Sequence, residues 1–401
     1  MDLADIDLLE DAWAAGVPHE AFALLRREAP VFRHPEPDGP GFWAVTRHAD
    51  VVAISRDPQT FSSELGATFI DDQTDEALAQ LRLSILNMDP PKHNRYRRLV
   101  SRGFTPRMVG KLTGTIEQRA AEIVDDIVDR GECELVEEVA GRLPLEIICD
   151  MIGIPRADRR RVFQLSNKLV GFDDPDMMTS PAEGEAAAAE IYSYCDAVAA
   201  ERRADPRDDL MSALVHAEVD GERLDDLELN LFFVTLVVAG NETTRNLIIH
   251  AVQALIDHPG EAERLRRQPE LWPTAVEEML RWGTSIHNVR RTATRDSEVG
   301  DQPVAEGDKV VMYYMSANRD EAVFDDPFRF DVGRTPNDHV TFGGGGVHHC
   351  LGANLARAEI RAMMRQLVVR LDNLQPAGPA PRLRSDFVNG VKAMPLRFTR
   401  R

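Results

Sequence analysis

The sequence predicts a mainly α-helical fold with a small β lobe, and two observations lead to that prediction. Several long segments carry apolar residues at the 3.6-residue spacing of a helix, whereas stretches typical of strands are few and short. The chain shows neither an internal repeat nor a low-complexity linker. We therefore expect residues 1–401 to form a single domain.

The most informative predicted helix is 224–255. Its middle part, from Leu231 to Gly240, is apolar nearly all round, which indicates a helix buried inside a large protein. The other segments with helical periodicity are 112–128, 186–203, 272–282 and 353–371.

Short strands are predicted at 41–45, 290–294 and 309–313. Residues 318–340 have little periodicity and contain several turn-forming residues, so we expect a meandering loop there. Residues 172–184 are interpreted as a mobile surface connection between two helices.

The charge balance argues against one class of partner. The formal net charge is -20, and a nucleic-acid binder needs a basic surface to contact phosphates. The chain starts with an acidic segment that has no apolar core, so no secretory signal is expected. The longest apolar run is too short for a bilayer, which needs about 20 residues. We therefore expect a cytoplasmic protein without a membrane anchor.

The four cysteines are widely spaced, which favours neither a disulfide framework nor a zinc site. Cys133, Cys149 and Cys195 are interpreted as small packing residues. Cys350 differs because the glycine run 343–346 precedes it and a predicted helix follows. Glycines let a backbone approach a flat ligand closely, and the start of a helix favours a thiolate, which is a strong donor to haem iron.

Two other interpretations of this glycine run were considered. A phosphate-binding loop also places glycines before a helix, but no Lys-Ser or Lys-Thr pair follows here and no clear strand precedes. A purely structural glycine turn beside an inert cysteine is the second alternative.

The buried helix contains the segment Ala239-Gly240-Asn241-Glu242-Thr243-Thr244. An acid and an alcohol are costly in an apolar helix unless they are used. Gly240 lets a ligand approach the backbone. The Thr243 hydroxyl can bond the carbonyl four residues earlier or release it to a bound oxygen species, and Glu242 can relay protons. The alternative is a local helix kink.

Two further pairs have helical spacing. Glu278 and Arg281 are three residues apart and can form an ion pair, which in most proteins is a solvated surface bridge. His93 and Arg97 are four apart and share a helix face. The alternative for each of these is an ordinary surface charge.

Taken together, these motifs resemble those of the cytochromes P450, over nearly the whole chain from Phe42 to Ser385. Residues 342–350 resemble the cysteine loop of that family, and residues 239–244 resemble its oxygen-activation motif. Phe342 lies one residue farther from the cysteine than in most of the family. The same extra residue occurs in the bacterial branch that hydroxylates sterol side chains and methyl-branched lipids.

The resemblance implies the P450 prism fold, with heme b (iron protoporphyrin IX) between the helices 224–255 and 353–371. Cys350 would be the proximal ligand of the iron, and Thr243 and Glu242 would handle protons. A buried structural triad would be formed by Glu278, Arg281 and Arg334. The other residues expected to contact the haem are His93, Arg97, Arg291, His348, Phe342 and Gly344.

The implied activity is a monooxygenase that hydroxylates an apolar small molecule with O2. The substrate would be a methyl-branched lipid, a terpenoid or a sterol side chain, as in the actinobacterial ω-hydroxylases and sterol 26-hydroxylases. Electrons would come from NAD(P)H through a ferredoxin reductase and a ferredoxin. We expect the ferredoxin to dock on the basic segment 92–111 of a monomer, to which Arg357 and Arg361 would add. The residues expected around the substrate are Leu236, Ala239, Gly240, Ile286, Val289, Phe387 and Val388.

Several functional alternatives remain open at this point. The protein could oxidise a polyketide or another secondary metabolite, use peroxide or isomerise its substrate, or bind haem without turnover. His287 and Asn288 are further expected to hold one polar group of the substrate.

Overall fold

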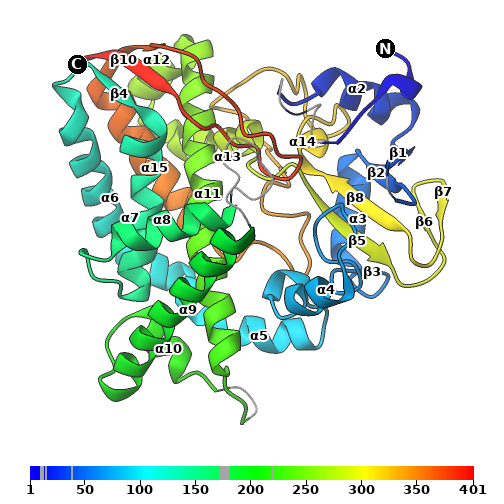
Figure 1. The fold of residues 1–401 in the computed structure, drawn as a ribbon. Coiled ribbons are helices and arrows are strands. Elements are labelled where there is room, and N and C mark those ends of the chain that lie inside the picture. The colour runs from blue at the N-terminus through cyan, green and yellow to red at the C-terminus, as the bar shows by residue number, and fades with distance from the viewer. Residues whose placement is uncertain (10–12, 14–15, 38, 171–180, 219–220) are drawn as a thin grey trace. The chain divides into compact units, whose positions relative to one another are not determined.

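The computed structural model describes the whole chain apart from residues 10–12, 14–15, 38, 171–180 and 219–220 (Figure 1). The chain divides into two compact units, each built from separate stretches of sequence. Unit 1 consists of residues 1–94, 269–350 and 382–390, and unit 2 consists of residues 95–268, 351–381 and 391–401. The single-domain expectation for residues 1–401 stays a prediction.

A β-sheet is the centre of unit 1. Among the described residues it has five strands in the order β1-β2-β8-β5-β3. Strands β2 and β8 are parallel, and the other neighbours are antiparallel. The strand bounds are β1 Val31–His34, β2 Phe42–Val45, β3 Phe61–Ser62, β5 Asn288–Ala293 and β8 Lys309–Tyr313.

Helices cover both faces of this sheet. Strand β8 is buried along its whole length, and its side chains alternate between two apolar clusters because successive residues of a strand point to opposite faces. Val310 and Met312 pack in the cluster that contains α3 (His48–Arg56). Val311 and Tyr313 pack in the cluster that contains α2 (His19–Glu28). This double burial explains why 309–313 is a continuous apolar run.

The remaining elements of unit 1 are short, with one exception. Helix α13 (Trp272–Gly283) confirms the helix predicted at 272–282. Residues 318–350 form neither helix nor strand, which confirms the meandering loop expected at 318–340. The other elements are η1 Leu3–Asp5, α4 Asp75–Leu81, η2 Ile85–Asn87, η5 Pro269–Leu271, β6 Ser297–Val299, β7 Gln302–Val304 and α14 Tyr314–Ala317.

Unit 2 is helical, and α11 (Asp226–Asp257) is its central element. This helix begins at a capping box formed by Asp225 and Glu228. Its neighbours in unit 2 include α7, α9 and α15. The helices of the unit are α5 Lys92–Val100, which begins in unit 1, η3 Ser101–Phe104, α6 Pro106–Val128, η4 Val136–Ala140, α7 Arg142–Ile152, α8 Arg159–Val170, α9 Pro181–Ala204, α10 Leu210–Val215, α12 Pro259–Arg267 and α15 Ala353–Arg370.

The predicted helices of unit 2 are confirmed, with changes at their ends. The helix expected from 112 begins at Pro106, where the Thr105 side chain accepts a hydrogen bond from Met108 N. Most of the connection expected at 172–184 lies outside the described residues. The prediction is wrong for 181–184, which form the first turn of α9.

The sequence analysis missed the small sheet of unit 2. In the described chain it has three strands in the order β4-β10-β9, with bounds β4 Glu132–Glu134, β9 Leu371–Pro376 and β10 Pro395–Arg400. These strands are largely polar and pair with distant segments, so local propensity indicates them weakly.

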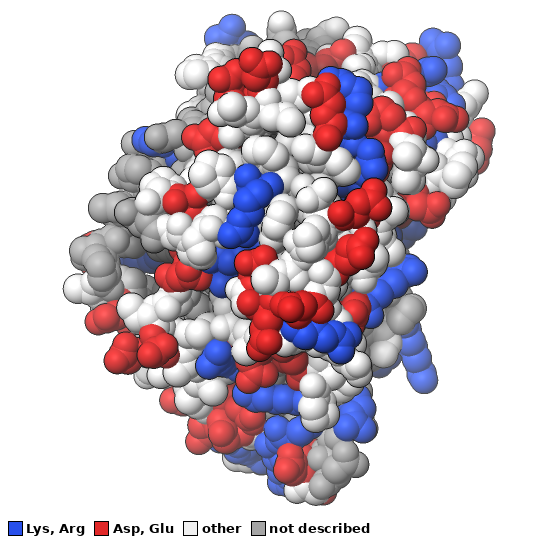
Figure 2. Space-filling model, turned by 90° about the vertical axis from the view of Figure 1, so that its right-hand side faces the viewer, with Lys and Arg blue, Asp and Glu red and all other residues white. Residues whose placement is uncertain are grey.

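Two surface properties of the described residues bear on the expected class of protein. On the face shown in Figure 2, acidic and basic side chains are interspersed. None of the helices in the described part of the chain is long and apolar enough to cross a lipid bilayer.

Candidate active site

Cys350 ends a closed loop in unit 1. Its backbone N–H donates to the carbonyl of Phe342 at 2.9 Å, which brings the two ends of the glycine run together. Among the four cysteines, all of which lie in the described part of the chain, Cys350 is the exposed one. Burial raises the pKa of each of the other three thiols to about 12, as expected of packing residues.

The glycines of this loop are required by backbone conformation and by packing. Gly343, Gly345 and Gly346 have φ values of 89°, 95° and 75°, a region that residues with a side chain rarely adopt. A β-carbon on Gly344 would lie 2.7 Å from Ser55 Oγ of α3, and one on Gly346 would overlap the Ser55 carbonyl. Within unit 1 the loop therefore packs closely against α3, and the expected approach to a flat ligand stays a prediction. The expected haem contacts of Gly344 and Phe342 stay predictions.

The loop is preceded by a buried ion-pair network on α13. Arg281 donates to both carboxylate oxygens of Glu278, at 2.7 and 2.8 Å, and neither side chain is exposed. Arg334 Nε lies 3.2 Å from Glu278 Oε2. The structure thus brings together the three residues of the expected triad, and a solvated surface bridge is excluded for Glu278 and Arg281.

This network fixes the meandering loop that leads to Cys350. Arg281 Nη1 donates to the carbonyls of Asn318 and Pro327, each at 2.9 Å. Near the end of the loop, Thr341 Oγ1 donates to the Leu280 carbonyl of α13 at 2.9 Å. Contacts from α13 therefore restrain both the start and the end of the segment 318–341.

Three of the residues expected to hold the haem lie in unit 1. His93 is buried, and its ring centroid is 4.3 Å from that of His348. His348 Nε2 lies 3.1 Å from Ser63 Oγ. Arg291 is buried and donates to the Arg290 carbonyl at 2.8 Å.

Arg291 lacks an anionic partner of its own. Burial lowers the pKa of its guanidinium, although Tyr314 and Asp89 act in the opposite direction. No carboxylate of the described residues forms an ion pair with it. A buried guanidinium is costly unless it is paired, so this position fits the carboxylate of a bound ligand.

The expected oxygen-activation residues lie at the middle of α11, in unit 2. Thr243 Oγ1 donates to the Ala239 carbonyl at 2.7 Å, four residues earlier. Ala239 is exposed and Gly240 and Thr243 are partly exposed, although α11 is largely buried on either side of them. This part of the helix therefore leaves room for a ligand. Glu242 is buried, and its carboxylate accepts hydrogen bonds from Arg245 and Asn246.

The comparisons with known proteins agree with this geometry. The family model described as Cytochrome P450 matches residues 182–390. A methyl-branched lipid omega-hydroxylase of Mycobacterium tuberculosis (strain ATCC 25618 / H37Rv) is 46% identical, over 99% of this chain and 95% of that protein. The chain belongs to the cytochrome P450 family. A steroid C26-monooxygenase of Rhodococcus jostii (strain RHA1) is 39% identical over 95% of this P450 and 82% of the relative.

Solved structures give the same result for the fold. The Mycobacterium marinum cytochrome P450 CYP268A2, in complex with pseudoionone, matches with a TM-score of 0.91 and 43% identity, over 98% of both chains. The expected mainly α-helical P450 fold is confirmed. Membership of the family makes this protein a monooxygenase with a haem-thiolate cofactor. An exposed Cys350 fits that cofactor, as does a buried Arg291 that forms no ion pair with the described residues.

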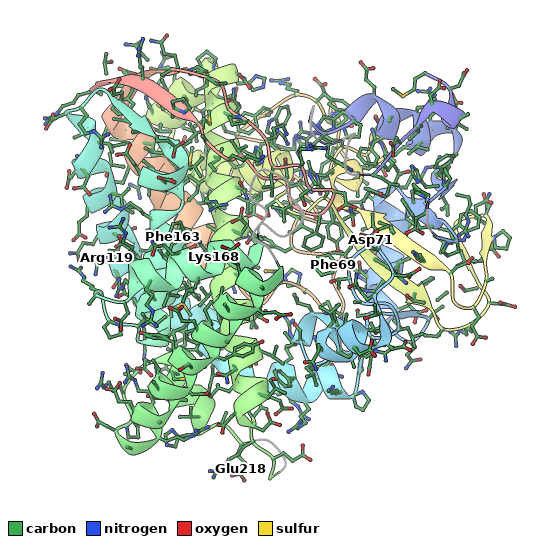
Figure 3. All side chains as sticks on the ribbon, in the orientation of Figure 1. Phe69, Asp71, Arg119, Phe163, Lys168 and Glu218 are labelled. Carbon is green, nitrogen blue, oxygen red and sulfur yellow. The ribbon has the colours of Figure 1, made fainter. Side chains whose placement is uncertain are left out.

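The apolar residues expected around the substrate are found in both units. In unit 1, Ile286 pairs with Val388 in an isolated β-bridge, and Val289 is partly buried. The Phe387 ring lies 4.9 Å from that of Phe69, and Phe69 is labelled in Figure 3. The sequence analysis did not single out Phe69, which lies in a segment without helical or strand periodicity.

Leu236, Ala239 and Gly240 are on α11 in unit 2, where Leu236 is buried. Arg97, expected to contact the haem, is partly buried on α5, four residues after His93.

His287 and Asn288, which are expected to hold a polar group of the substrate, are both buried in unit 1. The His287 ring is 4.1 Å from that of Trp13. The Asn288 amide donates to the Asp386 carbonyl at 2.7 Å. Their expected contact with a substrate stays a prediction.

Removal of Arg281 should strongly destabilise the protein. Arg281→Ala leaves Glu278 as a buried charge without its main partner, which costs about 3–5 kcal/mol. Denaturant unfolding measures this loss. The control is Arg267→Ala, because Arg267 pairs with Glu263 on the exposed surface of α12 and should cost less than about 1 kcal/mol. Equal losses in the two variants would contradict the structural role of the buried triad.

Proposed function

We propose that Cys350 is the iron ligand and that the protein hydroxylates an apolar lipid, namely a methyl-branched chain, a terpenoid or a sterol side chain. The observation that carries the proposal is the single exposed thiol among the four cysteines, at the end of a loop that the buried triad restrains. When bound, the haem supplies the activation of O2 and the transfer of one oxygen atom to a C–H bond, while the other atom leaves as water.

The residues of this chain would hold the cofactor and manage protons. Arg291 offers a buried positive charge for a propionate of the haem, and the adjacent His93 and His348 offer further donors. Arg97 lies four residues after His93 on the same face of α5 and would add a further donor. Thr243 would release the Ala239 carbonyl and donate to a bound oxygen species, and Glu242 would supply the proton.

The apolar character of the expected substrate residues supports a lipid substrate. Burying an apolar chain yields about 25 cal/mol for each Å² removed from water, which suits a branched acyl chain or a sterol better than a sugar. The names of the relatives, a methyl-branched lipid omega-hydroxylase and a steroid C26-monooxygenase, are consistent with this class. A terminal C–H bond is stronger than its neighbours, so the residues around the substrate must impose the position by orientation.

The assignment of Cys350 is tested by Cys350→Ser. A hydroxyl does not replace a thiolate as a donor to haem iron, so the red-shifted Soret band of the reduced carbon-monoxide complex should disappear. The matched control is Cys133→Ser, which removes a buried thiol and should retain the band. Retention of the band by Cys350→Ser would make another residue the ligand.

The substrate class is tested with a panel of linear and methyl-branched fatty acids, isoprenoid alcohols, sterols and polyketides. Branched lipids or sterols should shift the haem spectrum and give products that are hydroxylated at a terminal methyl group, as read by mass spectrometry. Turnover of polyketides alone would favour the secondary-metabolite alternative, and tight binding without any product would favour a haem-binding protein.

We further propose that a ferredoxin docks on α15 and α6. These helices pack together in unit 2, and a hollow of about 260 Å³ on them is lined by residues that include Arg361, Arg365 and Arg370. In the segment 92–111, Arg95 forms ion pairs with Glu222 and Glu228, and on the new surface Arg370 pairs with Asp125. The proposal therefore rests on Arg361 and Arg365. Electrons from NAD(P)H would reach the protein, acting as a cytoplasmic monomer, through a reductase and this ferredoxin.

Charge reversal tests the docking surface. Arg361→Glu combined with Arg365→Glu should slow reduction by an acidic ferredoxin about tenfold or more, because electrostatic steering is lost. Salt should slow reduction of the unmodified protein in the same way. Stopped-flow reduction measures both effects. Arg267→Glu on α12 is the control and should reduce normally. Identical rates in all variants would remove these arginines from the docking surface.

A further inference from the structure

The carboxylate of Glu242 is held by two donors from its own helix. Arg245 Nη2 donates to Glu242 Oε1, and the ion pair is largely buried on both sides. Asn246 Nδ2 donates to the same oxygen at 2.8 Å. Asn246 is fixed in turn, because its Oδ1 accepts from the Val391 N–H at 3.2 Å. The resting position of Glu242 is therefore defined by a charged donor and a neutral one.

This resting position separates the acid from the alcohol. Residues three and four apart share a helix face, whereas adjacent residues do not. Glu242 is accordingly turned toward Arg245 and Asn246. Thr243 instead bonds back to the Ala239 carbonyl, on the part of α11 that is accessible. Glu242 must leave Arg245 before its proton can reach the Thr243 side.

The Arg245 side chain lies against the turn between η4 and α7. A β-carbon on Gly141 would lie 2.9 Å from the Val136 carbonyl oxygen and 3.3 Å from Arg245 Cδ, so the glycine leaves room for both. Arg245 Nε is buried and has no hydrogen-bond partner in the described part of the chain. Buried donors of this kind are normally satisfied by water.

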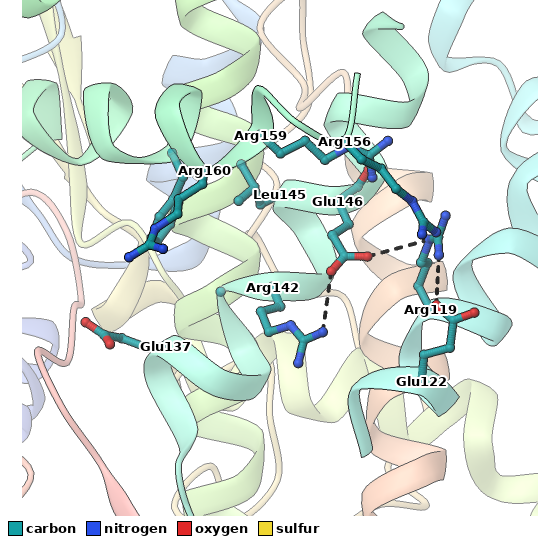
Figure 4. Close-up of a pocket in the computed structure, with 11 residues that line it drawn as sticks. Arg119, Glu122, Glu137, Arg142, Leu145, Glu146, Arg156, Arg159 and Arg160 are labelled. Carbon is teal, nitrogen blue, oxygen red and sulfur yellow. Dashed lines mark hydrogen bonds and ion pairs between the residues drawn. The ribbon is translucent and has the colours of Figure 1, made fainter. Parts of the chain in front are cut away.

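Gly141 also lines a charged hollow. The hollow is a cavity of about 570 Å³ among α6, η4, α7 and α8 of unit 2 (Figure 4). Glu146 lies 3.6 Å from Arg119 Nε and 3.7 Å from Arg142 Nη2 across this cavity. The Arg142 side chain is about one-third exposed, so solvent has access to these charges.

From these contacts we infer that Arg245 is the positioning residue for Glu242. Arg245 holds the carboxylate on the side of α11 that faces the hollow, where it recovers a proton from solvent, and releases it toward Thr243 during turnover. This inference rests on the proposed proton relay through Glu242 and Thr243. Beyond that relay, it names Arg245 as the residue that positions the Glu242 carboxylate, and it names the side of α11 from which protons arrive.

The test compares Arg245→Met and Arg245→Lys with Glu242→Gln and Thr243→Ala in the haem-loaded protein. The substrate is a long-chain fatty acid with a methyl branch at its end, and product formed per NADPH is measured in H2O and D2O. Arg245→Met should lower this ratio at least about fivefold, because the Glu242 carboxylate is misplaced. Glu242→Gln should lower it by a similar factor, because the carboxylate is absent. The lost electrons should appear as peroxide or water. Arg245→Lys retains the positive charge and should stay within about twofold of the unmodified protein.

A second measurement does not depend on turnover. The infrared carboxylate band of Glu242 is assigned in the substrate-free protein by subtracting the spectrum of Glu242→Gln. Arg245→Met should shift this band and Arg245→Lys should largely restore it. The matched control is Arg203→Met, since Arg203 forms an exposed ion pair with Asp226 of the same helix α11. It should change neither the band nor the product ratio.

A smaller change should act through the same contact. Gly141→Ala places a methyl group against the Val136 carbonyl and Arg245, and it should lower the product ratio to the extent that Arg245 is displaced. Gly114→Ala in α6, where a β-carbon meets open space, should not.

The outcomes separate the inference from the proposed function. Normal coupling and an unshifted band in Arg245→Met, together with low coupling in Glu242→Gln, would overturn the role of Arg245 alone. Normal coupling in both Glu242→Gln and Thr243→Ala would overturn the proposed relay. The infrared band would then decide by itself whether Arg245 positions the carboxylate.

Discussion

The buried charge network around Glu278 is the interaction on which the cysteine loop depends. A carboxylate inside a protein is stable only when donors surround it, and here the donors come from both α13 and the segment that leads to Cys350. The same carboxylate receives the Asp331 N–H at 3.0 Å and the Asn337 amide at 3.1 Å. A loop of more than twenty residues without regular structure is thus held in one conformation by a single fully buried acid.

Most of the fold could be predicted from the sequence, because its long helices carry apolar residues at the 3.6-residue spacing of a helix. The all-round apolar segment at 231–240 became the centre of α11, and β8 was found because both of its faces are buried. Strands β9 and β10 could not be predicted in the same way. Their partners are far away in the chain, β9 is largely polar, and the alternation of Leu396, Arg397 and Phe398 in β10 is short.

Site residues whose role follows from their chemical type could be predicted from the sequence. The direction in which a side chain points could not. The types and spacing of Cys350, Glu278 and Thr243 were sufficient to single them out. The sequence does not reveal which way Glu242 turns, because the choice depends on Arg245, Asn246 and the missing side chain at Gly141. Likewise, the sequence does not reveal that the His287 ring packs against Trp13 from the other end of the chain.

The interleaving of the two units along the chain has a consequence for biosynthesis. Unit 1 is completed only by residues 382–390, where the Asn389 amide donates to the Gly283 carbonyl at 2.7 Å, directly after α13. Unit 2 is completed by 391–401, where β10 pairs with β4 near residue 133. Neither unit can therefore close before residues 382–401 have been synthesised, and contacts of such large sequence separation form slowly. The nascent polypeptide stays open until this stretch has left the ribosome, so the enclosure of a prosthetic group is a late event in folding.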